Sequence, residues 1–229
     1  TSSASANSVQ AASQSLQMSE PRTRSSTLDD SYFNSLYAQA EDPWGFATRW
    51  YERRKYDLTL AALPRRHYAS AFEAGCSVGV LTADLAGRCA RLLAADTSAE
   101  AVRRAAARTA HLPQVTIERR RVPEQWPPGR FDLVVLSEIG YYFSADDLPA
   151  LISASVAALL PGGTLLAAHW RHPVADYPLR GDDVHEAIAT NPGLERTVRH
   201  EEADFRLDVF QRVPPAAVSV AESEGLAGS

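Results

Sequence analysis

The chain has 229 residues, of which 45% are hydrophobic and 22% are charged, and its formal net charge is −5. This length and composition suit one sizeable domain. The acidic balance argues against a nucleic-acid partner, which would need a basic surface, and no apolar run is long enough to cross a membrane. The start of the chain also lacks the basic and apolar pattern of a secretory signal.

The two cysteines, Cys76 and Cys89, are too few for a disulfide framework. Neither has neighbours at the spacing of zinc ligands, so we expect no metal site. We expect both to be reduced thiols in a cytoplasmic protein.

Both ends of the chain lack hydrophobic periodicity. Residues 1–28 are rich in Ser, Ala and Gln and predict a disordered N-terminal tail, and residues 213–229 predict a C-terminal tail. Residues 29–212 are predicted to form one domain. Its first part, 29–64, is predicted to be a helical extension that precedes the sheet.

The extension contains two predicted helices. Residues 32–37 have an amphipathic pattern, and a second helix is expected over 50–63, where Pro64 ends it. Aromatic residues in the intervening turn, 42–46, are expected to anchor it.

The most informative segment is the glycine turn at residues 72–79. A short apolar strand over 68–72 precedes it, and a helix is expected to begin at Leu81. Gly75 and Gly79 allow the backbone to approach a ligand closely, because glycine has no Cβ. The carboxylate of Glu73 would repel a pyrophosphate and attract a cationic amino-acid ligand, which favours S-adenosylmethionine over NAD.

A second strand is predicted over 91–96 and ends in Asp96, which follows Glu73 by 23 residues. An acid about 20 residues after such a turn is placed to bind ribose hydroxyls. The alternative is an acid that merely favours the start of the next helix, predicted over 99–110. Thr97 or Ser98 is the expected N-cap.

Further strands are predicted over 115–120, 131–138 and 164–170, with a helix over 148–160 that ends at Pro161-Gly162-Gly163. The run at 131–138 is almost continuously apolar, as in a parallel strand covered on both faces.

The C-terminal part is predicted to contain a helix over 182–188 and paired strands over 194–202 and 204–212, one of them antiparallel. In the last strand Phe205, Leu207 and Val209 alternate with polar residues. The alternation of strands and helices along the chain predicts a doubly wound α/β sheet.

The order of these motifs closely resembles class I S-adenosylmethionine-dependent methyltransferases over residues 32–212. The resemblance is carried by residues 73–79, Asp96, 131–135 and 160–163. Within that group the chain resembles the nodulation protein S family, through Asp42-Pro43-Trp44, Glu73-Ala74-Gly75-Cys76 and Ser137-Glu138-Ile139-Gly140-Tyr141-Tyr142.

The resemblance implies a seven-stranded Rossmann-like sheet whose helical extension covers the cofactor. It also implies N-methylation of the free amine of a deacetylated chitooligosaccharide or another amino sugar. The enzyme would be a monomer or homodimer that converts S-adenosyl-L-methionine to S-adenosyl-L-homocysteine.

The cofactor contacts expected from the glycine turn, strand ends and resemblance are Glu73, Gly75, Cys76, Gly79, Val80, Leu81, Asp96, Thr97, Ser98 and Ser137. Family members often carry an acid after the third strand, near the adenine. None stands at the expected place here unless Glu124 replaces it, so Arg121 and Val122 are expected to hold the adenine through their backbone.

The acceptor is expected beyond the carboxyl ends of the strands. Glu138 could bind the amine or pair with Arg171, and the candidate bases are His169 and His172. His169 is alternatively a core histidine. The expected substrate contacts, for which core packing is the alternative, are Trp44, Arg54, Tyr141, Tyr142, Trp170 and Tyr177.

Three other functions stay open at this point. An NAD(P) oxidoreductase would want a third glycine where Val80 follows Gly79. A non-catalytic methyltransferase-like module would often have lost the acid or a glycine of the turn. An O-methyltransferase acting on a sugar or natural product would share every motif described above.

Overall fold

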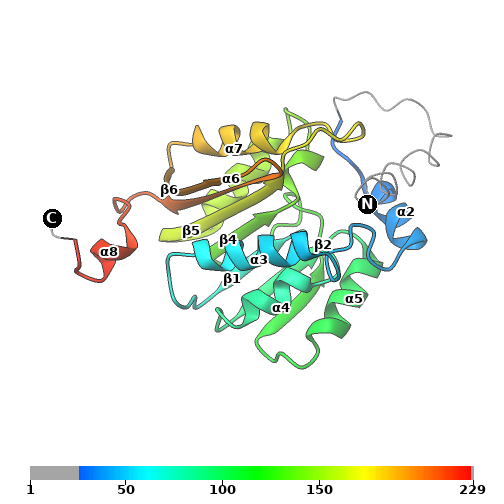
Figure 1. Ribbon diagram of the computed structural model, residues 1–229, viewed down its shortest axis with the longest axis horizontal. Helices are drawn as coiled ribbons and strands as arrows, with labels where there is room; N and C mark the ends of the chain where they lie inside the picture. Colours follow the sequence, from blue (N-terminus) through cyan, green and yellow to red (C-terminus); the bar gives the residue numbers. More distant parts are fainter. Residues whose placement is uncertain (1–25, 228–229) are drawn as a thin grey trace.

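A seven-stranded sheet in the order β3-β2-β1-β4-β5-β7-β6 forms the centre of the computed structural model, which describes residues 26–227 (Figure 1). The strands are β1 (Ala71–Ala74), β2 (Leu92–Asp96), β3 (Val115–Arg119), β4 (Phe131–Ser137), β5 (Leu159–Trp170), β6 (Leu194–Glu201) and β7 (Phe205–Arg212). Strands β1 to β5 are parallel, and β7 runs antiparallel between β5 and β6. The predicted doubly wound sheet with one reversed strand is confirmed.

Helices cover both faces of this sheet (Figure 1). They are α2 (Asp30–Gln39), α3 (Trp50–Ala62), α4 (Val80–Ala86), α5 (Ala99–Thr109), α6 (Leu148–Ala158), α7 (Gly181–Ala189) and the short α8 (Val220–Ser223), with a 3₁₀ turn, η1, over Gly140–Tyr142. Helices α3, α4 and α5 lie on one face and α6 and α7 on the other. Within residues 26–227, no helix combines the length and the apolar character needed to span a membrane.

Two apolar cores form because successive strand residues point to opposite faces of the sheet. Phe72 of β1 packs with the α6 and α7 side, whereas its neighbour Ala71 packs with the α3 and α4 side. Every residue of β4 is buried, which explains its nearly continuous apolar sequence. Each large apolar side chain buried in this way contributes about 1.5–3 kcal/mol.

The boundary between α6 and β5 differs from the prediction. The helix ends at Ala158 and the strand begins at Leu159, which pairs with Phe131 of β4 and is completely buried. The predicted stop at Pro161-Gly162-Gly163 instead lies within β5, where the register against β4 shifts and Gly162 has φ +71°. Core burial of Leu159 and its pairing with β4 outweigh its helix propensity.

The alternating pattern of β7 is present, but neither of its faces is open to water. The polar residues Arg206 and Asp208 are only 2% and 0% exposed, because α7 covers that side of the strand. Their burial requires polar partners.

The predicted domain boundaries are only partly within the described residues. Residues 1–25 and 228–229 lie outside them, so the disorder predicted there stays a prediction. Thr27 and Leu28, which the prediction assigns to the tail, contact the domain: Thr27 Oγ1 accepts from the amide of Ser144, and the amide of Leu28 donates to the carbonyl of Tyr142.

We expect Gly79→Ala to destabilise the domain by about 2 kcal/mol or more. Gly79 has φ +76°, and an added Cβ would lie 2.9 Å from Cα of Ala105 on α5. Gly129→Ala is the matched control, because Gly129 has φ +104° but no atom of residues 26–227 lies within 4 Å of an added Cβ. Denaturant unfolding of both variants measures the difference, and equal losses would contradict the packing argument.

Candidate active site

A pocket of about 1020 Å³, its open mouth included, lies at the carboxyl ends of β1, β2 and β4. Helix α2 and the turn before α3 cover it. The predicted cofactor residues that line it are Glu73, Gly75, Cys76, Val80, Leu81, Asp96, Thr97, Arg121, Val122 and Ser137. Parallel strands place their ligand site at this edge.

Gly79 and Ser98, which were also predicted to contact the cofactor, do not line the pocket. Gly79 precedes α4 and packs against Ala105, so its missing Cβ serves helix packing. Ser98 is completely buried and is the N-cap of α5, where its hydroxyl accepts from the amide of Ala101.

The backbone of the glycine turn is already bonded within the protein. The amides of Gly75 and Cys76 donate to the carbonyl of Ala95 at 2.8 and 2.9 Å. The amide of Ser77 donates to Oδ2 of Asp96 at 2.9 Å, and Oδ1 of Asp96 accepts from the amide of Ser98 at 2.9 Å. These three turn amides are therefore not free to cradle a phosphate, as a dinucleotide would require.

Two carboxylates form the floor of the pocket, the buried Glu73 and the partly buried Asp96. Burial raises the pKa of Glu73 to about 8, although Thr82 donates to its Oε2 at 2.6 Å. Burial likewise raises the pKa of Asp96 to about 6, against the stabilising bonds from backbone amides. A cationic or hydroxyl-bearing ligand would stabilise both ionised groups.

The N-terminal extension covers the pocket at the carboxyl edge of the sheet. Asp30 at the start of α2 accepts from the hydroxyl of Thr97 at 2.5 Å and from Arg121 at 2.8 Å. At the other end of the helix, the hydroxyls of Tyr37 and Ser77 lie 2.6 Å apart. The Arg121 side chain is thus ion paired with Asp30.

Glu138 enters the pocket directly after β4, from a backbone with φ +56°. Its Oε1 accepts from Nζ of Lys55 at 2.5 Å. Its Oε2 accepts from the hydroxyl of Tyr141 and from the amide of Trp170, the latter at 3.0 Å. The predicted pairing with Arg171 is wrong: Arg171 binds Asp182 and other acceptors near α7.

Lys55 on α3 is almost fully buried beneath the pocket. Its ammonium lies 2.8 Å from Glu52 and faces the rings of Phe46, Tyr51 and Tyr56 at 5.9, 5.3 and 5.7 Å. Burial lowers the pKa of Lys55, but the Glu138 and Glu52 carboxylates outweigh that effect and leave it raised. Lys55 therefore stays a cation and cannot accept a proton.

The structure does not bring the two predicted histidine bases to the pocket. His169 is completely buried, with both ring nitrogens hydrogen bonded inside the protein. His172 is exposed and pairs with Asp204 at 2.7 Å. Neither imidazole can reach a substrate proton in this geometry, which corrects their assignment.

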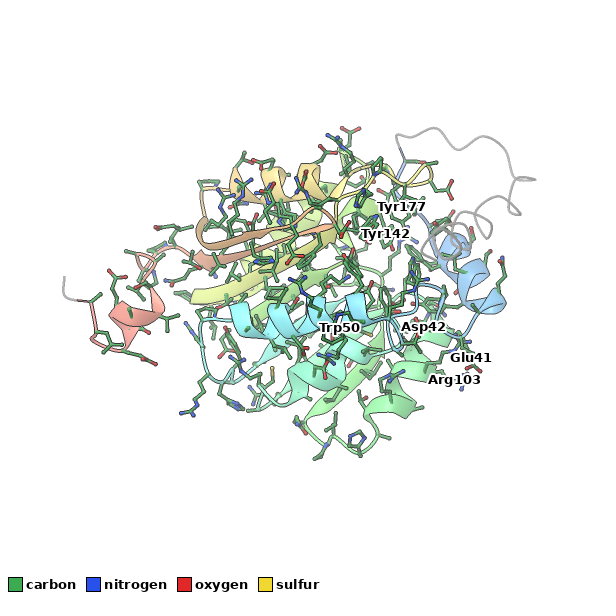
Figure 2. The ribbon with its side chains drawn as sticks, in the orientation of Figure 1. Glu41, Asp42, Trp50, Arg103, Tyr142 and Tyr177 are labelled. Carbon is green, nitrogen blue, oxygen red and sulfur yellow. The ribbon has the colours of Figure 1, made fainter. Side chains whose placement is uncertain are left out.

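Only some of the predicted acceptor contacts line the pocket. Trp44 and Tyr142 line the pocket, and Tyr177 packs against Tyr142 with ring centroids 4.9 Å apart (Figure 2). Tyr141 lies behind the wall as a hydrogen-bond donor to Glu138.

Arg54 and Trp170 lie outside the pocket lining. Arg54 forms a bidentate ion pair with Glu202, and the Trp170 ring packs against Tyr51. Both contribute to the packing of α3 against β5 and the β6–β7 turn.

The family model of nodulation protein S matches residues 34–177 of this chain. The chain belongs to the nodulation protein S family. This confirms the family predicted from the sequence.

Two comparisons show the extent of the likeness. Nodulation protein S of Rhizobium tropici is 30% identical over 132 residues, which are 56% of this chain and 54% of that protein. The chain thus spans about half the length of this curated relative. The crystal structure of a candidate methyltransferase from Pseudomonas syringae is 49% identical, covers 72% of this chain and 100% of its own, and has a TM-score of 0.65.

The structure of the N-methyltransferase NodS from Bradyrhizobium japonicum WM9 was solved with S-adenosyl-L-homocysteine. It is 25% identical, covers 80% of this chain and 99% of its own, and has a TM-score of 0.72. The Rossmann-like class I methyltransferase fold is therefore confirmed for this family member.

Several pocket residues escaped the sequence analysis. They come from the extension and the segment after β4, and include Thr27, Leu28, Asp30, Phe33, Tyr37, Phe46, Tyr56, Ser77, Ile139 and Phe143. The aromatic density of residues 32–56 was the available signal, but a pattern of apolar residues does not distinguish a lid from a core helix.

We expect Glu73→Gln to stabilise the ligand-free protein increasingly as pH rises from about 4.5 to about 8. The folded pKa of Glu73 is about 8 and its ordinary value is 4.5, so the native state holds a proton that the unfolded state releases between these values. Stability of the parent then falls with rising pH by up to about 1.4 kcal/mol per pH unit, and the glutamine removes this loss.

Chemical unfolding of parent and variant at pH 5, 7 and 9 checks this sign. Thr82→Val is the useful companion, because it removes a side-chain hydrogen-bond donor to Glu73 and should raise the carboxyl pKa further. A difference between parent and glutamine variant that shrinks with rising pH would contradict the assignment.

Proposed function

We propose that this chain is an S-adenosylmethionine-dependent methyltransferase whose acceptor is the amine of an amino sugar or a related small molecule. The observation that carries the proposal is the pocket with two carboxylates on its floor, Glu73 and Asp96, whose pKa values burial raises, in a member of the nodulation protein S family. The solved NodS relative with S-adenosyl-L-homocysteine supports the cofactor.

The residues of the pocket fit this cofactor. S-adenosylmethionine, when bound, supplies a sulfonium methyl group to an in-line nucleophile. Asp96 still has lone pairs for ribose hydroxyls besides the two amides that it accepts. Glu73 and Asp96 together provide the negative potential that a cationic amino-acid moiety needs, and Val122 provides an apolar surface for a base.

The acceptor side of the pocket is aromatic with one carboxylate. Phe46, Tyr56 and Tyr142 line it together with Glu138. A carboxylate can accept about four hydrogen bonds, and Glu138 accepts three from the protein. It therefore has capacity for one donor from the acceptor, which would orient an amine lone pair by holding its N–H.

Glu138 orients the acceptor, because Lys55 and Tyr141 hold its carboxylate in a fixed position. The amine would enter in its neutral form. The rate would come chiefly from orientation and from the exclusion of water under α2.

We expect S-adenosyl-L-homocysteine to bind at micromolar Kd and NADH not to bind. Asp96→Asn should weaken binding by about 1–3 kcal/mol, since the ribose loses a charged acceptor. Because the pKa of Asp96 is about 6, the parent affinity should also fall as pH drops below that value, and the variant should not share this loss.

Isothermal titration calorimetry between pH 5 and 8 tests both statements. Asp57→Asn is the control, because the Asp57 side chain is 60% exposed and pairs with Arg53 on the outer surface of α3. Normal affinity of Asp96→Asn combined with a lowered melting temperature would assign Asp96 to the turn and helix start alone.

We expect methyl transfer to deacetylated chitooligosaccharides and none to fully acetylated ones. Glu138→Gln should lower kcat at least tenfold while the Kd of S-adenosyl-L-homocysteine changes less than twofold. Transfer assays with labelled S-adenosylmethionine measure these rates. Equal transfer to both sugars, or transfer to neither together with tight cofactor binding, would reject the amino-sugar acceptor and leave O-methylation as the alternative.

A further inference from the structure

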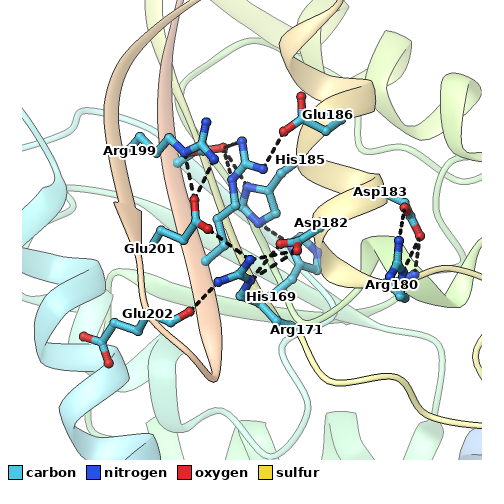
Figure 3. A network of polar contacts seen from close by, with 12 residues as sticks. His169, Arg171, Arg180, Asp182, Asp183, His185, Glu186, Arg199, Glu201 and Glu202 are labelled. Carbon is cyan, nitrogen blue, oxygen red and sulfur yellow. Dashed lines mark hydrogen bonds and ion pairs between the residues drawn. The ribbon is translucent and has the colours of Figure 1, made fainter.

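An unbroken hydrogen-bonded chain runs through the core between α7 and the sheet, from Gly140 to Asp208, and Figure 3 shows its two histidines. The amide of Gly140 lies 3.0 Å from Nε2 of His169. Nδ1 of His169 lies 3.1 Å from Nε2 of His185, and Nδ1 of His185 lies 2.9 Å from Oδ2 of Asp208. All three side chains are completely buried.

The direction of every bond in this chain is fixed from its Gly140 end. A backbone amide only donates, so Nε2 of His169 must accept and its proton must be on Nδ1. That proton is donated to Nε2 of His185, which places the proton of His185 on Nδ1, facing the carboxylate of Asp208. Both histidines are therefore neutral Nδ1–H tautomers.

The environment of the two rings agrees with this assignment. The pKa of His169 is lowered well below its usual value by burial, and then by the nearby His185 and the Lys55 cation. The pKa of His185 is also lowered by burial, although Asp208 opposes the shift. Protonation of either ring would place two N–H groups face to face, at Gly140 and His169 or at His169 and His185.

Asp208 is the fixed end of the chain. Nε of Arg206 donates to its Oδ2 at 3.0 Å, and Nη1 of Arg206 continues to Glu186 on the outer side of α7 at 2.6 Å. Burial alone would raise the pKa of Asp208, but His185 and Arg206 outweigh it and keep the pKa low. The carboxylate thus stays ionised and imposes the tautomer of His185.

The other end of the chain lies in the pocket wall. Gly140 begins η1, and its amide has no partner within that turn. Glu138, Ile139 and Tyr142 on the same segment line the pocket, and Glu138 has the left-handed φ of +56°. Such a backbone costs about 1–3 kcal/mol and persists only where surrounding contacts determine it.

We propose that the chain Asp208–His185–His169 is a positioning device that holds the segment 138–142 in the geometry needed to orient the methyl acceptor. This rests on the proposed function of Glu138. His169 and His185 act through Gly140 and do not touch the acceptor. The chain holds geometry and does not carry protons, because it ends on a backbone amide.

¹⁵N NMR of the histidine rings tests the Asp208–His185–His169 hydrogen bonds without any substrate. We expect both His169 and His185 to be Nδ1–H tautomers at pH 7, in contrast to the Nε2–H form that free imidazole side chains favour. His185→Asn can still donate to Asp208 but no longer accepts from His169, so His169 should lose its tautomer preference. An Nε2–H or cationic form of either ring in the parent would overturn the proposal.

Two substitutions of His169 test the positioning role. In His169→Gln the side-chain oxygen can still accept from the amide of Gly140, whereas His169→Leu leaves that amide without a partner. We expect the leucine variant to lose at least tenfold in kcat and to exchange the Gly140 amide at least tenfold faster, with the Kd of S-adenosyl-L-homocysteine within twofold of the parent. The glutamine variant should regain kcat to within about threefold.

His111→Gln, at an exposed histidine after α5, is the control and should change none of these values. If His169→Leu fails to fold, amide exchange in His185→Asn provides the same readout. Equal kcat in the leucine and glutamine variants, or unchanged exchange at Gly140 in both His169→Leu and His185→Asn, would overturn the positioning role. Failure of the proposed function would instead appear as absent transfer in the parent, with the tautomers and amide exchange unaffected.

Discussion

The buried ion pair between Lys55 and Glu138 joins the N-terminal extension to the carboxyl edge of the sheet. Lys55 belongs to α3, and Glu138 follows β4. Removing one partner of a buried pair typically costs about 3–5 kcal/mol, because the other charge is left uncompensated. The position of α3, the wall of the pocket and the strained backbone of Glu138 all depend on this contact.

The pair also shapes what the pocket can do. Lys55 and Tyr141 fix the position of the Glu138 carboxylate, which leaves this group one acceptor site to orient a donor. Burial raises the pKa of Glu73 to about 8 and the pKa of Asp96 to about 6. Desolvation thus tunes both carboxyl groups on the pocket floor.

Polar groups buried on the α7 side of the sheet also hold the segment that follows β4. A core can be stable without them, and well-packed apolar residues often serve as well. Asp208, His185 and His169 instead connect α7 and two strands to the amide of Gly140. The segment that carries Glu138 is therefore held from the α3 side by Lys55 and from the α7 side by a histidine.

The sequence alone determined the sheet, its order of elements and most of the pocket floor. The strand and helix periods are local, and the glycine turn and Asp96 are adjacent to strand ends, where parallel topology fixes the ligand edge. The sequence predicted the ends of the elements less well. Leu159 was predicted in the helix but belongs to β5, because core burial outweighed its helix propensity.

Only the tertiary structure decided the roles of the polar residues. In sequence, His169 could be a base at a strand end, and Arg206 and Asp208 could be an ordinary polar face. Once α7 covers that face, these side chains are excluded from water and must bind one another. Likewise Lys55 and Glu138 are 83 residues apart, and no local pattern pairs them. The partner of a buried charge depends on how distant elements pack, which the order of residues along the chain does not express.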